Sequence, residues 1–125
     1  MPVRIGVVGV GTFGINHLRA FRQASREGAA ELLAAADLNP DRLEAMCREF
    51  GIRGYQNYRE MLEKEALDAV SVATPDHLHG EIVVTALEAG KHVLVEKPLD
   101  VTVAGCERML AAAQAAGRLL EVDFH

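Results

Sequence analysis

Short apolar runs and amphipathic stretches alternate along this chain from one end to the other. The apolar runs are rich in valine, isoleucine, leucine and alanine, which is typical of strands buried on both faces of a sheet. We expect strands at Val3–Val8, Glu31–Ala36, Ile52–Tyr55, Asp68–Ala73, Lys91–Val95 and Arg118–Phe124. The stretches between these runs favour helices, because most of them place apolar residues at helical spacing. Helices are predicted at Phe13–Arg26, between Pro40 and Gly51, and at Tyr58–Glu65, His79–Ala89 and Val103–Ala116.

This alternation predicts an α/β fold. Strands that are separated by helices form a mostly parallel sheet, and the helices cover both of its faces. We therefore expect a doubly wound sheet of six strands. No linker, low-complexity segment or repeat divides the sequence, so residues 1–125 are expected to form one domain.

The composition fits a globular domain and argues against several kinds of partner. The 125 residues include 13 Lys and Arg against 18 Asp and Glu, which gives a net charge of −5. Nucleic-acid binding needs clustered cations, and the sequence shows no such cluster. No segment approaches the roughly 20 apolar residues of a membrane helix, and the N-terminus lacks the cationic start of a signal peptide. We therefore expect a cytoplasmic protein with no nucleic-acid or membrane partner.

The cysteines and histidines do not predict a metal site. Cys47 and Cys106 lie far apart and share no metal-finger spacing, so both are expected to be reduced, buried thiols. His77 and His79 are two residues apart, but no third ligand accompanies them. We expect His17, on the first helix, to have a structural role.

The most informative motif is the glycine-rich sequence GVGTFG that follows the first expected strand. Because it links a buried strand directly to a helix, this G-x-G-x-x-G motif predicts dinucleotide binding. Gly9 would permit the tight turn, Gly11 the close approach of backbone to a pyrophosphate, and Gly14 close helix–strand packing. The alternative is that the glycines only turn the chain from strand to helix. The cofactor-binding residues expected in this loop and at the helix N-terminus are Gly9, Gly11, Thr12, Phe13 and Gly14.

Asp37 supplies the second part of a dinucleotide fingerprint. It ends the second expected strand, 23 residues after Gly14. A carboxylate at this position accepts hydrogen bonds from the adenosine ribose and repels a 2′-phosphate, so we expect NAD rather than NADP as the cofactor. Arg42 could reach a 2′-phosphate, which keeps NADP as the less favoured alternative. Asp37 could instead serve only to cap the following helix or turn.

The second half of the chain carries a series of short motifs. Residues 73–99 read ATPDHLHGEIVVTALEAGKHVLVEKPL. Together with the glycine loop, they resemble the N-terminal NAD(P)-binding Rossmann domain of the glucose–fructose oxidoreductase/inositol dehydrogenase (Gfo/Idh/MocA) family. The resemblance extends from Val3 to the last expected strand. It implies hydride exchange between a nicotinamide ring and a hydroxyl- or carbonyl-bearing carbon of a sugar, cyclitol or related compound.

The resemblance also implies roles for individual residues. Lys97 is expected to be catalytic, because an ammonium group at the carboxyl end of a central strand can stabilise negative charge on the reacting oxygen. Glu96 is expected to orient Lys97 or to contact the nicotinamide ribose. Thr74 and Pro75 are expected to line the cofactor, with His79 packed near it. The alternative for Lys97 is a solvated lysine at a strand end. The alternative for Thr74 and Pro75 is a loop that merely turns the chain.

Members of this family continue into a second α/β domain that supplies most of the substrate and subunit contacts. Nothing in this chain resembles that substrate domain, so we expect the chain alone to be incomplete for catalysis. The full-length protein is expected to act on a small sugar or polyol and to form a homo-oligomer. Two alternatives remain, a stand-alone nucleotide-binding module without turnover and the cofactor domain of an NAD-dependent glycosidase.

Overall fold

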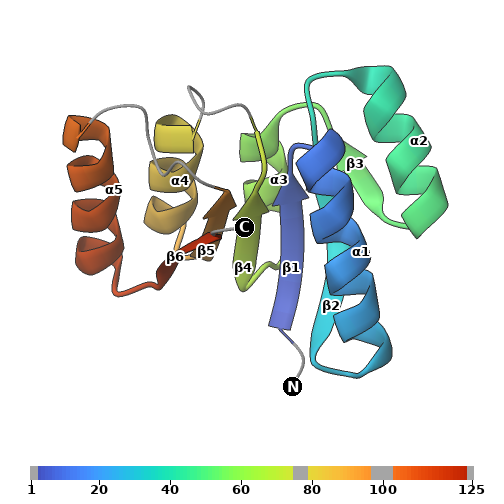
Figure 1. Cartoon of the computed structure of the whole chain (residues 1–125), viewed down its shortest axis with the longest axis horizontal. Coiled ribbons are helices and arrows are strands. Elements are labelled where there is room, and N and C mark those ends of the chain that lie inside the picture. Colours follow the sequence, from blue (N-terminus) through green and yellow to red (C-terminus); the bar gives the residue numbers. More distant parts are fainter. Residues whose placement is uncertain (1–2, 75–78, 97–102, 124–125) are drawn as a thin grey trace.

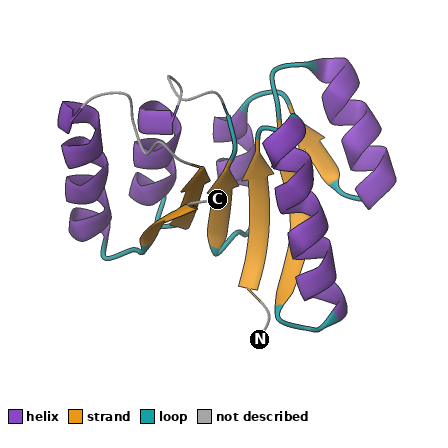
Figure 2. Ribbon diagram, viewed as in Figure 1, coloured by secondary structure: helices purple, strands orange, loops and turns teal. Residues whose placement is uncertain are grey.

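The structure is a computed structural model that describes residues 3–74, 79–96 and 103–123. Strands and helices alternate along the chain (Figures 1 and 2), and their bounds lie within two residues of those expected. The strands are β1 (Val3–Val8), β2 (Ala30–Ala36), β3 (Arg53–Tyr55), β4 (Ala69–Val72), β5 (His92–Glu96) and β6 (Leu120–Asp123). The helices are α1 (Thr12–Arg26), α2 (Pro40–Phe50), α3 (Tyr58–Lys64), α4 (His79–Glu88) and α5 (Val103–Ala116).

The strands form one six-stranded parallel sheet in the order β3-β2-β1-β4-β5-β6. The chain builds outward from β1 to β3 and then returns through α3 to place β4 on the other side of β1. The strand order therefore reverses between β1 and β4, which pair from Ile5 opposite Ala69 to Val8 opposite Val72. Open α/β sheets bind their ligands at the carboxyl ends of strands beside such a reversal. The prediction of a doubly wound Rossmann sheet is confirmed.

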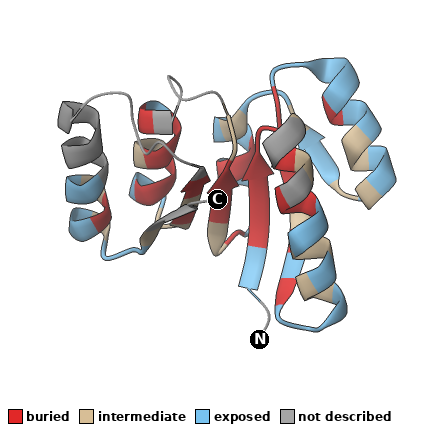
Figure 3. Cartoon of the chain, viewed as in Figure 1, coloured by how far each residue is buried: buried red, intermediate tan, exposed pale blue. Residues whose placement is uncertain are grey.

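Helices cover both faces of the sheet, and each face has its own core. On one face, α1 and α2 pack over a cluster of buried residues comprising Val7, Val10, Leu18, Leu32, Ala35 and Leu43. On the other face, α3, α4 and α5 contribute to a larger cluster that includes Val8, Ala34, Val70, Val83 and Leu87. Successive strand residues enter different clusters because their side chains point to opposite faces. Figure 3 shows the buried residues gathered along the central strands β1 and β4.

The start of α2 is fixed by residues that also lie close to the candidate site. Asn39 is the N-cap, and its side chain accepts a hydrogen bond from the Arg42 amide at 3.1 Å. Pro40 occupies the first helical position, where its fixed φ and missing N–H are tolerated. Gly51 ends the helix with a φ of +66°, a left-handed conformation that favours glycine. The first turn of α2 is therefore held directly after the end of β2.

Candidate dinucleotide-binding site

Loops from distant parts of the sequence meet at the carboxyl end of β1. The Gly9 amide donates a hydrogen bond to the carbonyl oxygen of Ala36, at the end of β2, over 2.7 Å. The Ala73 amide, directly after β4, donates to the carbonyl oxygen of Val8 over 2.8 Å. These bonds continue the sheet beyond the strand ends. They bring the loops after β1, β2 and β4 side by side.

Two glycines of the loop are required by the fold itself. Gly9 has a φ of +94°, and a Cβ atom there would lie 2.8 Å from the carbonyl oxygen of Ala73. A Cβ atom on Gly14 would lie only 1.8 Å from the carbonyl oxygen of Gly9. The first turn of α1 thus contacts the end of β1 with no room for a side chain. These are the tight turn and the close helix–strand contact that the motif predicts.

Gly11 differs from these two glycines because the fold leaves space beside it. Its backbone has a φ of −75°, which does not require glycine. The nearest atoms to a Cβ on Gly11 would be Nη1 and Cζ of Arg42, at 3.7 and 3.9 Å, an ordinary contact with a flexible side chain. The packing of the chain therefore does not require a glycine here. A group that approaches the backbone from outside would require one.

The N-terminus of α1 is left without a side-chain cap. Its N-cap residue is Gly11, whereas α2 and α3 are capped by the side chains of Asn39 and Asn57. The first turn of α1 also contains no acidic residue. Such a terminus offers its N–H groups and the positive end of the helix dipole to an anion. Thr12 and Phe13 open this helix, and their side chains lie outside the described part of the structure.

Asp37 is buried beside the glycine loop and is held by several donors. Its Oδ2 accepts a hydrogen bond from the Val10 amide and its Oδ1 accepts one from the Asn39 amide, each at 2.8 Å. Nη2 of Arg42 lies 3.0 Å from Oδ1 and 3.1 Å from Oδ2. Burial opposes ionisation, but these hydrogen bonds together outweigh it and hold the pKa of Asp37 below its ordinary value. The group is therefore anionic at neutral pH.

These bonds show that Asp37 does not serve only as a helix cap. Asn39 is the residue that caps α2, and Asp37 instead joins the end of β2 to the glycine loop through Val10. Sequence reasoning did not anticipate the bond from Val10 or the ion pair with Arg42. The five-residue spacing between Asp37 and Arg42, across the start of a helix, is a sequence signal that could have indicated the ion pair. The bond from Val10 has no comparable local signal.

The structure places the remaining predicted site residues to different extents. Thr74 lies against the glycine loop, since a Cβ on Gly9 would be 3.1 Å from its Cγ2. His79 is the first residue of α4 and Glu96 the last residue of β5, but neither side chain is described. Pro75 and Lys97 lie outside the described residues. The roles expected for all five of these residues stay predictions.

His17 makes contacts inside the fold, which is consistent with the structural role expected for it. It is buried on α1, and its Nδ1 shares a hydrogen bond with Oγ of Ser71 in β4.

Across residues 3–74, 79–96 and 103–123, no group of three or more His, Cys, Asp or Glu is placed to hold a metal ion. Among the helices that the structure describes, none combines the length and the apolar character needed to cross a bilayer.

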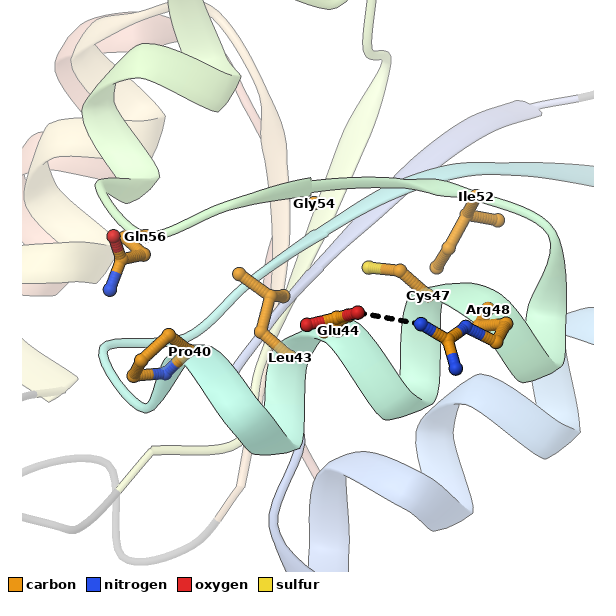
Figure 4. Close-up of a pocket in the computed structure, with 8 residues that line it drawn as sticks. All are labelled: Pro40, Leu43, Glu44, Cys47, Arg48, Ile52, Gly54 and Gln56. Carbon is orange, nitrogen blue, oxygen red and sulfur yellow. Dashed lines mark hydrogen bonds and ion pairs between the residues drawn. The ribbon is translucent and has the colours of Figure 1, made fainter.

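A separate cavity of about 440 Å³ lies between α2 and β3 (Figure 4). An ion pair between Glu44 and Arg48, 2.6 Å long, lies at this cavity. Burial raises the pKa of the Cys47 thiol, which is therefore neutral at neutral pH. The residues that line the cavity are Pro40, Leu43, Glu44, Cys47, Arg48, Ile52, Gly54 and Gln56. They include neither Asp37 nor any glycine of the loop, so this cavity is distinct from the candidate dinucleotide site.

Curated relatives match nearly the whole chain. The inositol 2-dehydrogenase of Salmonella typhimurium is 32% identical over a stretch that covers 99% of this chain and 37% of that protein. The inositol 2-dehydrogenase/D-chiro-inositol 3-dehydrogenase of Shouchella clausii is 39% identical, with 99% and 36% covered. The chain thus spans little more than a third of the length of these relatives.

Solved structures share the fold described above. The WlbA dehydrogenase of Bordetella pertussis, in complex with NADH and UDP-GlcNAcA, matches with a TM-score of 0.93 and 34% identity, covering 98% of this chain and 37% of that one. The biliverdin reductase of Synechocystis, in complex with biliverdin and NADP+, matches with a TM-score of 0.90 and 32% identity, covering 98% and 38%.

A family model matches residues 3–124, and it describes an oxidoreductase family with an NAD-binding Rossmann fold. The match covers the glycine loop, Asp37 and every described strand and helix. The resemblance drawn from the sequence motifs is therefore confirmed. The chain belongs to the Gfo/Idh/MocA oxidoreductase family and forms its NAD-binding Rossmann fold.

Proposed function

We propose that this chain binds a nicotinamide dinucleotide at the glycine loop, prefers NAD over NADP, and serves as the cofactor domain of an oxidoreductase. The contrast among the three glycines carries the proposal. Gly9 and Gly14 are required by the chain's own packing, whereas Gly11 borders space that a ligand can approach. Membership of a family with an NAD-binding Rossmann fold supports the same cofactor.

Each part of the site has a distinct task toward the dinucleotide. The pyrophosphate would lie against Gly11 and the N-terminus of α1, where N–H groups and the helix dipole stabilise negative charge. The carboxylate of Asp37 would accept hydrogen bonds from the adenosine ribose and repel a 2′-phosphate. Thr74 would line the crevice beside Gly9. NAD, when bound, supplies the nicotinamide ring that exchanges a hydride.

We infer that the hydride is exchanged with a sugar, cyclitol or related compound that carries a hydroxyl or carbonyl group. The names of the inositol 2-dehydrogenases and the UDP-GlcNAcA complex of the WlbA dehydrogenase support this substrate class. Lys97 remains our prediction for the catalytic residue that hydrogen-bonds the reacting oxygen. Glu96 is the last residue of β5, the neighbour of β4, and Lys97 is the next residue along the chain.

The substrate and subunit contacts of the whole protein are part of the proposal. Because the chain spans about 37% of its relatives' length, we propose that a second domain supplies the substrate contacts and the contacts of a homo-oligomer. A cytoplasmic location also stays a prediction.

Substitution of Gly11 tests the proposed function. Gly11→Val would fill the space beside the loop, so the affinity for NADH should fall by at least about 100-fold, or about 2.7 kcal/mol. The melting temperature should stay within about 3 °C of the wild type, because the chain's own packing tolerates a side chain there. NADH fluorescence titration and thermal unfolding measure the two quantities.

Two further variants make this test specific. Ala20→Leu adds bulk to an exposed position of the same helix and, because leucine is a good helix former, should leave both quantities close to those of the wild type. Gly14→Ala should instead lower the melting temperature, since its Cβ would lie 1.8 Å from a backbone oxygen. NADH binding by Gly11→Val at the wild-type affinity would refute the assignment of the site.

A further inference from the structure

Glu65 is a buried carboxylate that binds two side chains of the short strand β3. It is the C-cap residue of α3, and its side chain is only 3% exposed. It accepts hydrogen bonds from the Tyr55 hydroxyl over 2.5 Å and from Nη2 of Arg53 over 2.9 Å. Nε of Arg53 lies 2.8 Å from its Oε2. One buried anion therefore binds both the first and the last residue of β3.

The last residue of β3 also contacts the candidate dinucleotide site. The carbonyl oxygen of Tyr55 accepts a hydrogen bond from the Asp37 amide over 3.0 Å. The preceding residue, Ala36, accepts a hydrogen bond from the Gly9 amide. The backbone that carries the Asp37 carboxylate is thus held from the glycine loop on one side and from β3 on the other. Tyr55 links Asp37 to Glu65, because it bonds one through its carbonyl group and the other through its hydroxyl group.

The position of β3 explains why this link matters. The strand has three residues and lies at the edge of the sheet, next to β2. Its first two residues, Arg53 and Gly54, are exposed. Segments with few buried contacts and exposed backbone hydrogen bonds open more readily than the core. The bond from the Tyr55 hydroxyl to Glu65 fixes this strand at the residue that holds the Asp37 amide.

A buried carboxylate contributes more to geometry than to stability. Its removal from water carries a desolvation cost, and its attraction to an arginine does little more than offset that cost. Bidentate arginine–carboxylate pairs and short hydroxyl–carboxylate bonds are directional, so they fix the groups that form them. The bonds of Glu65 with Arg53 and Tyr55 are of these two kinds.

We propose that Glu65 is a positioning residue of the dinucleotide site, which holds the backbone of Asp37 in place through Tyr55. This inference rests on the dinucleotide binding proposed above. The effect of Glu65 on the cofactor passes through the carbonyl oxygen of Tyr55. Loss of the hydroxyl–carboxylate bond should therefore weaken cofactor binding, because the carboxylate of Asp37 is then held less firmly.

The test compares Tyr55→Phe with Tyr58→Phe, by NADH fluorescence titration and by hydrogen–deuterium exchange without cofactor. Both tyrosines are half-buried and pack against the larger core cluster. The Tyr58 hydroxyl contacts Glu81 and Thr85 at 3.4 Å, which is too long for a strong bond. In Tyr55→Phe, the Kd for NADH should rise by about threefold or more, and the Asp37 amide should exchange about tenfold faster or more. Tyr58→Phe should leave both values within about twofold of the wild type.

Two further measurements separate positioning from a general loosening of the fold. In an Asp37→Ala background the carboxylate is absent, so Tyr55→Phe should change the Kd for NADH by less than about twofold. The Ala73 amide bonds Val8 on the opposite side of β1 from β2. In Tyr55→Phe, this amide should exchange at the wild-type rate. Faster exchange at Ala73, or equal weakening of NADH binding in the Asp37→Ala background, overturns the proposal.

Glu65→Gln tests the other end of the link. It should raise the Kd for NADH by about threefold or more, and its combination with Tyr55→Phe should add less than about twofold to the larger single effect. Tyr55→Phe decides the matter if Glu65→Gln does not fold. If the wild-type chain binds NADH but the Kd does not respond to Tyr55→Phe, only this inference fails. If the wild-type chain does not bind NADH, the proposed function fails, and this inference fails with it.

Discussion

At the scale of single residues, two aspartates of this chain lower their pKa by different means. Asp37 is buried, and backbone amides contribute two of its hydrogen bonds. Asp68 is 39% exposed, and it accepts hydrogen bonds from the Arg4 amide at 2.9 Å and from the Arg4 guanidinium at 3.0 and 3.1 Å. These bonds from Arg4 lower the pKa of Asp68 from 3.8 to about 2, against a smaller effect of burial. They join the start of β1 to the residue before β4.

We expect the Asp68–Arg4 pair to make the folded chain sensitive to acid. Because the pKa of Asp68 is lower in the folded chain than its ordinary value of 3.8, the pair stabilises the fold above about pH 4, and this contribution is lost as the pH falls toward 2. The melting temperature of Asp68→Asn should therefore lie below that of the wild type at neutral pH. The difference should shrink below about pH 4. Thermal unfolding followed by circular dichroism across this range measures it, and a constant difference would contradict the assignment.

The sequence predicts the residues of the site more completely than the bonds between them. The glycine spacing and the aspartate at a strand end are local patterns, so the sequence alone reveals both. The bond from Val10 to Asp37 joins residues 27 apart and depends on the pairing of β1 with β2. The contact of Thr74 with Gly9 likewise depends on the pairing of β1 with β4. No local pattern fixes contacts of this kind.

At the scale of elements, leucines on two neighbouring helices differ in how far they are buried. Leu87 of α4 is fully buried within the larger core cluster. Leu110 of α5 is 57% exposed. The leucine side chain at position 87 therefore contributes much more to stability than the leucine side chain at position 110.

This difference gives a prediction with a matched control. Leu87→Ala should lower the free energy of unfolding by about 2 to 5 kcal/mol, since it removes buried methyl groups and leaves a cavity. Leu110→Ala should cost less than about 1 kcal/mol, because more than half of that side chain is already in water. Urea unfolding measures both values. Equal losses for the two variants would show that the core is placed wrongly.

The elements themselves follow from signals that the sequence carries. Gly51 and Gly90 have positive φ angles of +66° and +81°, and each follows the end of an expected helix. Asn39 and Pro40 mark the start of α2. The order of the strands has no such local signal, because β3 pairs with β2, and β4 with β1, across long stretches of sequence. From the sequence we therefore expected a doubly wound parallel sheet, but not this order of its strands.

At the scale of the whole molecule, the cofactor site and the reaction make different demands on the chain. Binding a dinucleotide needs the loops after β1, β2 and β4, all of which the chain contains. Hydride exchange also needs an oriented substrate and the exclusion of water. The chain spans about 37% of its relatives' length. We therefore propose that the second domain orients the substrate and excludes water.

We expect the 125-residue chain to bind NADH without catalysing turnover. With NAD and myo-inositol, the absorbance of NADH should rise no faster than it does without protein. The reason is that the chain alone lacks the protein groups that would orient the substrate. The inositol 2-dehydrogenase of Salmonella typhimurium, a relative of greater length, serves as the positive control under the same conditions. Turnover of a sugar or polyol by the chain alone would refute the need for a second domain.

The single carboxylate of Asp37 also has a consequence for local motion. It accepts hydrogen bonds from the amide of Val10, in the glycine loop after β1, and from the amide of Asn39, at the start of α2. Proteins open locally in cooperative units, and we expect the shared carboxylate to place these two amides in the same unit. Hydrogen–deuterium exchange should therefore report these two amides at similar rates, although they lie on different segments, and should slow at both when a dinucleotide is bound. The opening of the glycine loop and of the first turn of α2 is in this sense one event.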